Sequence, residues 1–369
     1  MSLLPTEQLI DRILDHIDNK TTDLGDQVWQ EPSSSYLSQE RFDAEVDLIR
    51  SSPVPFCPSA MLTETGSYVA RTAAGTPIVA VRGKDGVVRA FINACRHKGM
   101  SVAKGSGCKK VFVCPYHAWT YAMDGSLKGI PGKEGFPGVA MEDNGLVEVG
   151  AGEKGGLVYV NQKGTIDDST LEQFPDFFCS SQEFLEEEAI TDEANWKLLF
   201  ETTMEGYHIK GLHKTTFYPY GLDNINVVEN FGRHSRITFP FRRINKLRDI
   251  ERSERKIEGM VTSVYALFPN VSVSILSKHS TVTIFEPISP TRCTMLIYRV
   301  TNKLADGTTV DKKDAKVDAD FVKTTGFDED VEAAVSIQES ISAGTDFNLT
   351  FGLFEKAIVH FHQNFKEKL

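Results

Sequence analysis

Short β-rich runs dominate the chain between residues 67 and 127. They read "SYVAR", "PIVAVR", "VVRAFIN", "KVFV" and "WTYAM", and turn signals such as Asp85-Gly86 and Asp124-Gly125 separate them. Short β-rich runs joined by Asp-Gly turns are typical of antiparallel hairpins. We therefore predict a compact all-β domain in this part of the chain.

Near the N-terminus the apolar residues follow a helical period instead. Leu9, Ile10, Ile13, Leu14 and Ile17 recur at the spacing of an amphipathic helix. Such a helix buries one face, so we expect it to dock on the body of the protein or on a neighbouring subunit.

The second half of the chain mixes helical and extended patterns. Residues 195–213 have helical character, 263–287 and 293–302 read as longer strands, and 328–341 and 351–365 read as helices with apolar stripes. This order predicts an α+β domain with an antiparallel sheet and helices packed on one face.

Length and composition limit the class of protein. With 369 residues the chain can bury two ordinary cores, and two domains is the default expectation. No apolar run approaches the roughly 18 residues that span a bilayer, and the N-terminus carries acids where a secretory signal would be apolar. We therefore expect a cytoplasmic protein without membrane partners.

The net charge of −11 argues against a nucleic acid as a partner. The charge is uneven: an acidic stretch at 182–195 reads as a solvated edge, whereas ten basic and two acidic residues lie between Val81 and Lys133. We call residues 82–133 the basic segment. Each of its lysines alone is an ordinary solvated charge, but together they can steer an acidic protein partner.

Three of the six cysteines fall within the basic segment. Scattered cysteines in a chain of this length do not suggest a disulfide framework, so clustered thiols are candidate metal ligands. Cys95-x-His97 and Cys114-x-x-His117, with sixteen residues between them, each combine one thiolate with one imidazole. This ligand set binds either a structural zinc or a [2Fe–2S] cluster.

The context of the two pairs favours iron and sulfur. Zinc fingers with this ligand set usually place both histidines on one helix, whereas here each histidine follows its own cysteine in a β context. "CRHKG" and "CPYHAW" resemble the Rieske motif, and by this resemblance Cys95, His97, Cys114 and His117 hold a [2Fe–2S] cluster. Cys108 does not fit the pattern and is interpreted as a bystander thiol.

A second candidate metal site follows further along the chain, where Glu205, His208 and His213 fall within nine positions. On a regular α-helix the two histidines would lie about 140° apart, too far to share a metal. Gly211 permits a widened turn that brings both imidazoles toward one side. Two histidines and one carboxylate, with open positions, form the facial triad of non-haem Fe(II) oxygenases.

With both motifs present, the chain resembles the α subunits of Rieske non-haem iron oxygenases, also called aromatic-ring-hydroxylating oxygenases. The resemblance covers most of the length and includes "NWK…E…YH…H", an "ED…Q" segment at Glu329, Asp330 and Gln338, and a closing "FHQNF" helix. It implies that His208, His213 and Asp330 hold one mononuclear Fe(II) per subunit, beside one Rieske cluster.

The resemblance also implies the remaining roles at this site. Asp328 is the alternative carboxylate ligand. Glu205 stands three positions before His208, so its carboxylate can orient that ligand. In the family, the residue at this position lies between the mononuclear iron and the Rieske histidine of the adjacent subunit.

The resemblance implies an α+β architecture and a homotrimer as the active form. A helical arm at 1–53 would pack on the catalytic domain, a small all-β Rieske domain would occupy 54–163, and a helix-grip (START-like) catalytic domain with an antiparallel sheet would occupy 164–369.

The implied reaction is reductive oxygen activation. A ferredoxin or NAD(P)H-dependent flavin reductase would supply electrons, and O2 and a small organic substrate would meet at the iron. We expect hydroxylation of a small hydrophobic, aromatic substrate, as in aromatic hydrocarbon catabolism. The alternatives are N-demethylation of a quaternary ammonium compound and a non-enzymatic electron-transfer or redox-sensing role. Phe217, Phe231, Phe239 and Phe241 are candidates for an apolar pocket.

Overall fold

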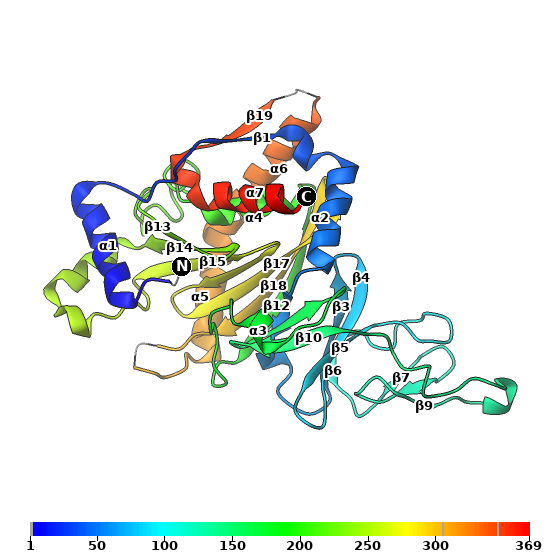
Figure 1. Cartoon of the computed structure of the whole chain (residues 1–369). Helices are drawn as coiled ribbons and strands as arrows, with labels where there is room; N and C mark the ends of the chain where they lie inside the picture. Colours follow the sequence, from blue (N-terminus) through cyan, green and yellow to red (C-terminus); the bar gives the residue numbers. More distant parts are fainter. Residues whose placement is uncertain (1–2, 305, 345–346) are drawn as a thin grey trace. The chain divides into compact units, whose positions relative to one another are not determined.

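A computed structural model describes residues 3–304, 306–344 and 347–369, and the chain forms two compact units (Figure 1). Residues 49–180 form one, which we call the inserted unit, and residues 1–48 and 181–369 together form the other, which we call the sheet-and-helix unit. The sequence suggested boundaries at 53/54 and 163/164, whereas the compact units divide at 48/49 and 180/181.

The inserted unit consists of two antiparallel sheets. Seven strands follow the order β2-β11-β10-β5-β4-β3-β6, and three short strands follow the order β7-β8-β9. The strands are β2 (Val54–Pro58), β3 (Ser67–Ala73), β4 (Thr76–Arg82), β5 (Val88–Ile92), β6 (Gly105–Cys108), β7 (Phe112–Val113), β8 (Thr120–Tyr121), β9 (Leu127–Gly129), β10 (Glu148–Lys154) and β11 (Leu157–Asn161). The hairpins expected between residues 67 and 127 are therefore present.

Residues beyond 163 complete this unit rather than begin the next one. A short helix, α3 (Asp168–Leu171), packs on β10. The ring of Phe174 lies 4.5 Å from that of Tyr159 on β11, and the backbone N–H groups of Phe177 and Phe178 both donate to the carbonyl of Gly155. These contacts tie residues 168–178 to the β10–β11 hairpin.

The sheet-and-helix unit is built on a second antiparallel sheet of seven strands, in the order β12-β18-β17-β16-β15-β14-β13. The strands are β12 (Phe184–Asp192), β13 (Val227–Phe231), β14 (His234–Pro240), β15 (Val261–Leu267), β16 (Val271–Ile275), β17 (His279–Ser289) and β18 (Arg292–Thr301). The segment 263–287, expected as one long strand, is thus folded back into three, with turns at 268–270 and 276–278.

The acidic stretch at 182–195 forms the edge strand β12 of this sheet. Two of its carboxylates are neutralised from the neighbouring strand, because Arg299 on β18 forms ion pairs with Glu186 at 3.2 Å and with Glu188 at 3.1 Å. Charged side chains on an edge strand oppose pairing with other sheets, which agrees with the expected solvated edge.

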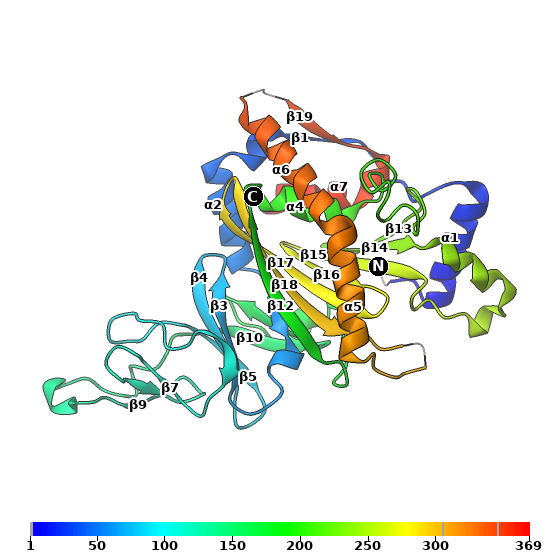
Figure 2. The same ribbon diagram turned by 180° about the vertical axis from the view of Figure 1, so that it is seen from behind.

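This unit also contains helices, and the fold is α+β as expected. They are α1 (Thr6–Asn19), α2 (Gln39–Arg50), α4 (Trp196–Glu201), α5 (Lys312–Val322), α6 (Asp328–Ser342) and α7 (Lys356–Lys368). Figure 2 shows α5 and α6 following one another as a single rod across the strands, joined by a π-helical turn at Lys323–Phe327. Apolar side chains of α4, α6 and α7 share one core with the sheet.

The N-terminal residues are integrated into this unit from two directions. The apolar stripe of α1 packs with Val227, Ile244, Leu247 and Val261, so the amphipathic helix docks on the body of its own chain. Further on, β1 (Trp29–Pro32) pairs antiparallel with β19 (Asn348–Phe351), and Figure 1 shows the two strands side by side above α7.

A buried ionic network joins the N-terminal arm to α4. The Lys197 ammonium is fully buried and lies 2.6 Å from Glu45, whose other oxygen accepts from the indole N–H of Trp196. Burial lowers the pKa of Lys197, which Glu45 opposes. Removing one partner of such a pair costs about 3–5 kcal/mol, so this network fixes where α4 begins.

The helix expected over 195–213 ends early. The α-helical part stops at Glu201 and a 3-10 turn continues to Met204, after which Glu205 is extended (φ −145°, ψ 163°). The carboxylate of Glu205 accepts hydrogen bonds from the backbone N–H groups of Tyr207 and His208, a local bond that competes with helix formation. Residues 205–221 consequently form a series of turns.

In the part of the chain that the structure describes, no helix is both long and apolar enough to cross a membrane.

Candidate metal centres

Two similar loops in the inserted unit carry the cysteine and histidine pairs. Cys95 follows β5 and Cys114 follows β7. In the first loop the Cys95 N–H donates to the carbonyl of Met100, and in the second the Cys114 N–H donates to that of Trp119. The imidazole rings of His97 and His117 lie 4.6 Å apart, between centroids, so the loops bring all four predicted cluster residues to one end of the unit.

The two residue types differ in exposure within this group. Both thiols are buried in the core of the unit and neither forms a disulfide, whereas His117 is exposed and His97 is half-buried. The Tyr121 hydroxyl lies 3.2 Å from the Cys95 sulfur. Partial desolvation, with the nearby His117 and Lys98, lowers the pKa of His97, which favours the neutral imidazole that binds a metal.

This donor set fits a [2Fe–2S] cluster. Cys95 and Cys114 belong to one core cluster, the rings of His97 and His117 lie 4.6 Å apart, and Nδ1 of His97 is buried without a hydrogen-bond partner in the structure. Buried polar atoms normally have a partner, so this nitrogen is available to a metal. Cys108 stays apart, exposed on β6 with its sulfur 3.5 Å from the Thr65 carbonyl.

In the sheet-and-helix unit, His208 and His213 lie in the turns after α4, and Asp330 lies in the first turn of α6. One ligand atom from each falls within 4.8 Å of the others. Oδ1 of Asp330 is 3.0 Å from Nε2 of His213 and 3.4 Å from Nε2 of His208. The turns therefore place both imidazoles on the same side, but the helix ends at Glu201 and does not break near Gly211 as expected.

A second carboxylate holds the other nitrogen of each ring. Glu205 contacts Nδ1 of His208, and Oε2 of Glu329 lies 2.7 Å from Nδ1 of His213. A carboxylate at Nδ1 fixes the tautomer and points Nε2 toward a metal. Burial lowers the pKa of both histidines, but the carboxylate partners outweigh it and raise each pKa.

These residues fit a mononuclear iron. Oδ1 of Asp330 is buried, and its contacts with the two imidazoles lack the geometry of a hydrogen bond. Three donor atoms that converge on one point without satisfying one another suit a cation, and the surrounding carboxylates supply negative charge. Two histidines and one carboxylate match the ligand preference of non-haem Fe(II).

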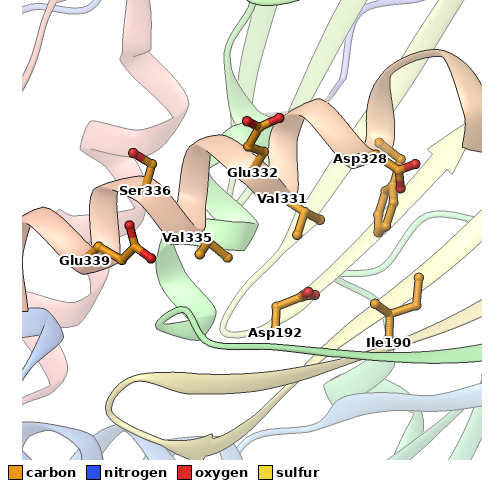
Figure 3. A pocket seen from close by; sticks show the side chains of 9 residues that line it. Ile190, Asp192, Asp328, Val331, Glu332, Val335, Ser336 and Glu339 are labelled. Carbon is orange, nitrogen blue, oxygen red and sulfur yellow. The ribbon is translucent and has the colours of Figure 1, made fainter.

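Asp328, the alternative ligand, lies away from the histidines. It lines an open pocket of about 500 Å³ between β12 and α6. Figure 3 shows Asp328 near the start of the helix, with Ile190 and Asp192 on the strand below and Val331 pointing toward them. Residues 328, 332 and 336 share one face of α6, whereas Asp330 and the buried Ala334 and Gln338 occupy another.

Only one of the four pocket phenylalanines is seen beside the candidate iron site. The ring of Phe217 lies 4.9 Å from that of His213, whereas Phe231 packs against His234 and Phe241 lies under the guanidinium of Arg243. Phe239 packs at the edge of the main core.

In the sequence, Glu329 stands in the "ED…Q" segment but has no predicted role. Thr216 belongs to no pattern recognised there. The position of Glu329 directly before Asp330 was the available signal. Its partner His213 stands 116 positions away, so only the tertiary fold reveals the contact.

Fold and ligand geometry together define a two-domain protein with a Rieske unit and a mononuclear iron unit. Residues 183–369 match the family model described as "Ring hydroxylating alpha subunit (catalytic domain)", and residues 52–141 match "Rieske [2Fe-2S] domain". Because the first match covers just over half of the chain, the protein belongs to the ring-hydroxylating oxygenase α-subunit family. Its subunit accordingly carries one Rieske cluster and one mononuclear iron.

Several curated relatives are named as monooxygenases of carnitine, glycine betaine or choline. The carnitine monooxygenase oxygenase subunit of Acinetobacter pittii is 33% identical over 198 residues, which are 51% of this chain and 53% of the relative. The choline monooxygenase of Spinacia oleracea is 24% identical over 325 residues, 82% of this chain and 70% of the relative. The chain thus spans about half the length of the first of these relatives.

Solved structures share the fold over the whole chain. The quaternary ammonium Rieske monooxygenase CntA in complex with L-carnitine gives a TM-score of 0.76 at 21% identity, covering 100% of this chain and 99% of that one. Naphthalene 1,2-dioxygenase from Rhodococcus sp. gives 0.73 at 18% identity, covering 98% and 97%. At these identities the likeness establishes the fold alone.

Proposed function

We propose that this protein is the terminal oxygenase component of a Rieske monooxygenase that oxidises a quaternary ammonium compound. Cys95, His97, Cys114 and His117 hold the cluster in this proposal, and His208, His213 and Asp330 hold the iron. The observation that carries the proposal is the convergence of two Nε2 atoms and the buried Oδ1 of Asp330. A purely electron-carrying protein has no need of this second site.

The chemistry consumes two electrons and two protons for each O2. One oxygen atom enters a C–H bond of the substrate and the other leaves as water. The iron supplies the site at which O2 is reduced. His208, His213 and Asp330 would hold this iron, and Glu205 and Glu329 keep the two imidazole rings oriented.

The quaternary ammonium substrate replaces the aromatic one expected first. The support comes from relatives named for carnitine, glycine betaine and choline, among them the glycine betaine monooxygenase oxygenase subunit of Chromohalobacter salexigens, 36% identical over 157 residues, 40% of this chain and 35% of the relative. Oxidation at an N-methyl carbon leads to demethylation, so the expected product carries one methyl group fewer.

Electrons enter from a separate ferredoxin or flavin reductase at the basic segment. Arg82 and Arg89 are already paired, with Glu153 at 2.8 Å and Asp85 at 2.7 Å. Lys98, Lys109 and Lys110 are exposed, which makes these lysines the better candidates for an acidic donor protein.

The electron then passes between subunits of a homotrimer, with Glu205 as the link. One of its oxygens contacts Nδ1 of His208, and its side chain is 11% exposed. In the proposal this exposed part meets a cluster histidine of the adjacent chain. Inter-subunit electron transfer is described for a solved structure of a quaternary ammonium Rieske monooxygenase. That structure gives a TM-score of 0.76 at 22% identity and covers 100% of this chain and 99% of that one.

The test is a substrate screen with purified protein, a reductase and NADH. Carnitine, glycine betaine and choline are compared with naphthalene and benzoate, and O2 uptake and formaldehyde are measured together. Formaldehyde equal to the O2 consumed with one ammonium substrate supports the proposal. Coupled uptake with an aromatic substrate alone would replace it with ring hydroxylation.

A further inference from the structure

We propose that Glu329 is a positioning residue for the iron site, which holds His213 in the tautomer and orientation that binds the metal. This role rests on the proposed iron site, and it concerns a carboxylate outside the set of three ligands.

The contacts of Glu329 point to one task. Its Oε2 lies 2.7 Å from Nδ1 of His213 and also accepts a hydrogen bond from the Thr216 hydroxyl at 2.6 Å. With Nδ1–H donating to this oxygen, the lone pair of His213 is on Nε2, which lies 3.0 Å from Asp330. Two consecutive residues of α6 therefore hold opposite nitrogens of one imidazole.

The rest of the surroundings makes His213 depend on this contact. Its side chain is 1% exposed, whereas that of Glu329 is 32% exposed. The ring packs in a T-shaped arrangement with that of Phe217. Phe217 in turn lies against Gly326, where an added Cβ would come 2.2 Å from the ring. Gly326 belongs to the π-helical turn that precedes α6, so the same segment seats Phe217 and begins the helix that carries Glu329.

Glu205 and Glu329 each orient one of the two imidazoles. Glu205 orients His208 from the same loop, three positions away, whereas Glu329 reaches His213 from another helix. Loss of Glu329 therefore removes the connection between α6 and the loop on that side, and leaves a buried imidazole free to change tautomer. Carboxylate partners of metal-bound histidines typically contribute about 10- to 100-fold in metal affinity.

The experiment measures Co(II) binding to cluster-containing protein from which a chelator has removed the mononuclear metal. Glu329→Ala should raise the Co(II) dissociation constant about 10- to 100-fold and shift the Co(II) visible bands. Glu329→Gln keeps an oxygen that accepts from Nδ1–H, so it should restore most of the affinity. Thr216→Val should show a smaller loss in the same direction.

Two further variants separate the possible outcomes. Glu332→Gln changes an exposed acid one turn along on the pocket face, and it should bind Co(II) as the unmodified protein does. His213→Ala should lose the metal. If His213→Ala loses Co(II) while Glu329→Ala keeps it within twofold, the role of Glu329 is wrong. If both keep it, the iron site is wrong and the role falls with it. Unchanged cluster absorbance and apoprotein melting temperature show that each variant is folded.

Discussion

The two metal centres differ in how the chain assembles them. The cluster residues lie on two neighbouring loops of one small unit, between positions 95 and 117, and each loop is closed by its own backbone hydrogen bonds. The candidate iron residues come from a loop and a helix, and 116 positions separate His213 from Glu329. A local motif can form from its own hairpins, whereas the second centre needs the finished unit.

Their electrostatic surroundings differ as well. Within the described residues, no ion pair joins His97 or His117 to a carboxylate, and partial burial, with the nearby His117 and Lys98, lowers the pKa of His97. Burial lowers the pKa of His208 and of His213, but the carboxylates around each ring outweigh it and raise both pKa values. The first arrangement suits neutral imidazoles beside thiolates, and the second suits the capture of a cation.

The largest expected effect comes from removing single ligands at one metal centre and measuring the properties of both centres. His208→Ala, His213→Ala or Asp330→Ala should reduce turnover more than about 100-fold while the visible spectrum of the cluster stays unchanged. Cys114→Ser should abolish that spectrum and leave Co(II) binding at the other centre intact.

Asp328→Ala is the matched control, because Asp328 faces the pocket rather than the histidines. Full iron content and activity in Asp330→Ala, with loss of both in Asp328→Ala, would reverse the assignment of the carboxylate ligand.

A second test asks whether the two centres work across subunits. Cys114→Ser protein and His208→Ala protein are each expected to be inactive, but trimers assembled from both should regain turnover, because the cluster of one chain can serve the iron of the next. Glu205→Gln in the iron-containing partner should prevent this recovery. Mixed trimers, verified by mass, that retain both metals and remain inactive would confine electron transfer to a single chain.

A smaller effect should separate electron entry from oxygen chemistry. In the double variant Lys109→Glu/Lys110→Glu, each reversed charge weakens donor binding by up to about 1 kcal/mol. The KM for the protein donor should therefore rise several-fold, and the salt dependence of donor association should weaken. Activity with a small chemical reductant should stay the same. Donor kinetics that do not change would return both lysines to ordinary solvated charges.

The smallest expected effect concerns pH and the acidic surroundings of the iron site. Burial raises the pKa of Glu355 to about 7, and the charges of Glu205 and Glu201 add to the shift. The folded protein thus binds this proton more tightly than the unfolded chain, so Glu355 lowers stability as pH rises from about 4.5 to about 7.

Glu355→Gln removes this dependence and keeps an oxygen to accept from the Gly352 N–H. The variant should melt at a higher temperature than the unmodified protein at pH 8, and the difference should shrink toward pH 5. Glu332→Gln is the exposed control. A difference that does not vary with pH would mean that Glu355 stays ionised throughout.

The local features of the fold were predictable from the sequence. The hairpins around Asp85-Gly86 and Asp124-Gly125, the amphipathic α1 and the paired cysteines and histidines each depend on residues close together in the chain. The helix expected through His213 failed because the Glu205 side chain bonds to the backbone and ends it. The contact of Glu329 with His213 and the pairing of β1 with β19 are long-range, and no periodicity in the sequence encodes them.

The pairing of β1 with β19 has a consequence for how the polypeptide is made. Gln30 and Thr350 are joined side chain to side chain across 320 positions. At a synthesis rate of about 5–20 residues per second, the arm leaves the ribosome tens of seconds before its partner strand. Residues 49–180 all emerge in the meantime, so the inserted unit can complete its sheet during translation. The arm therefore lacks its final partners, including Lys197 for Glu45, until later segments emerge. During that interval it is open to chaperones and proteases.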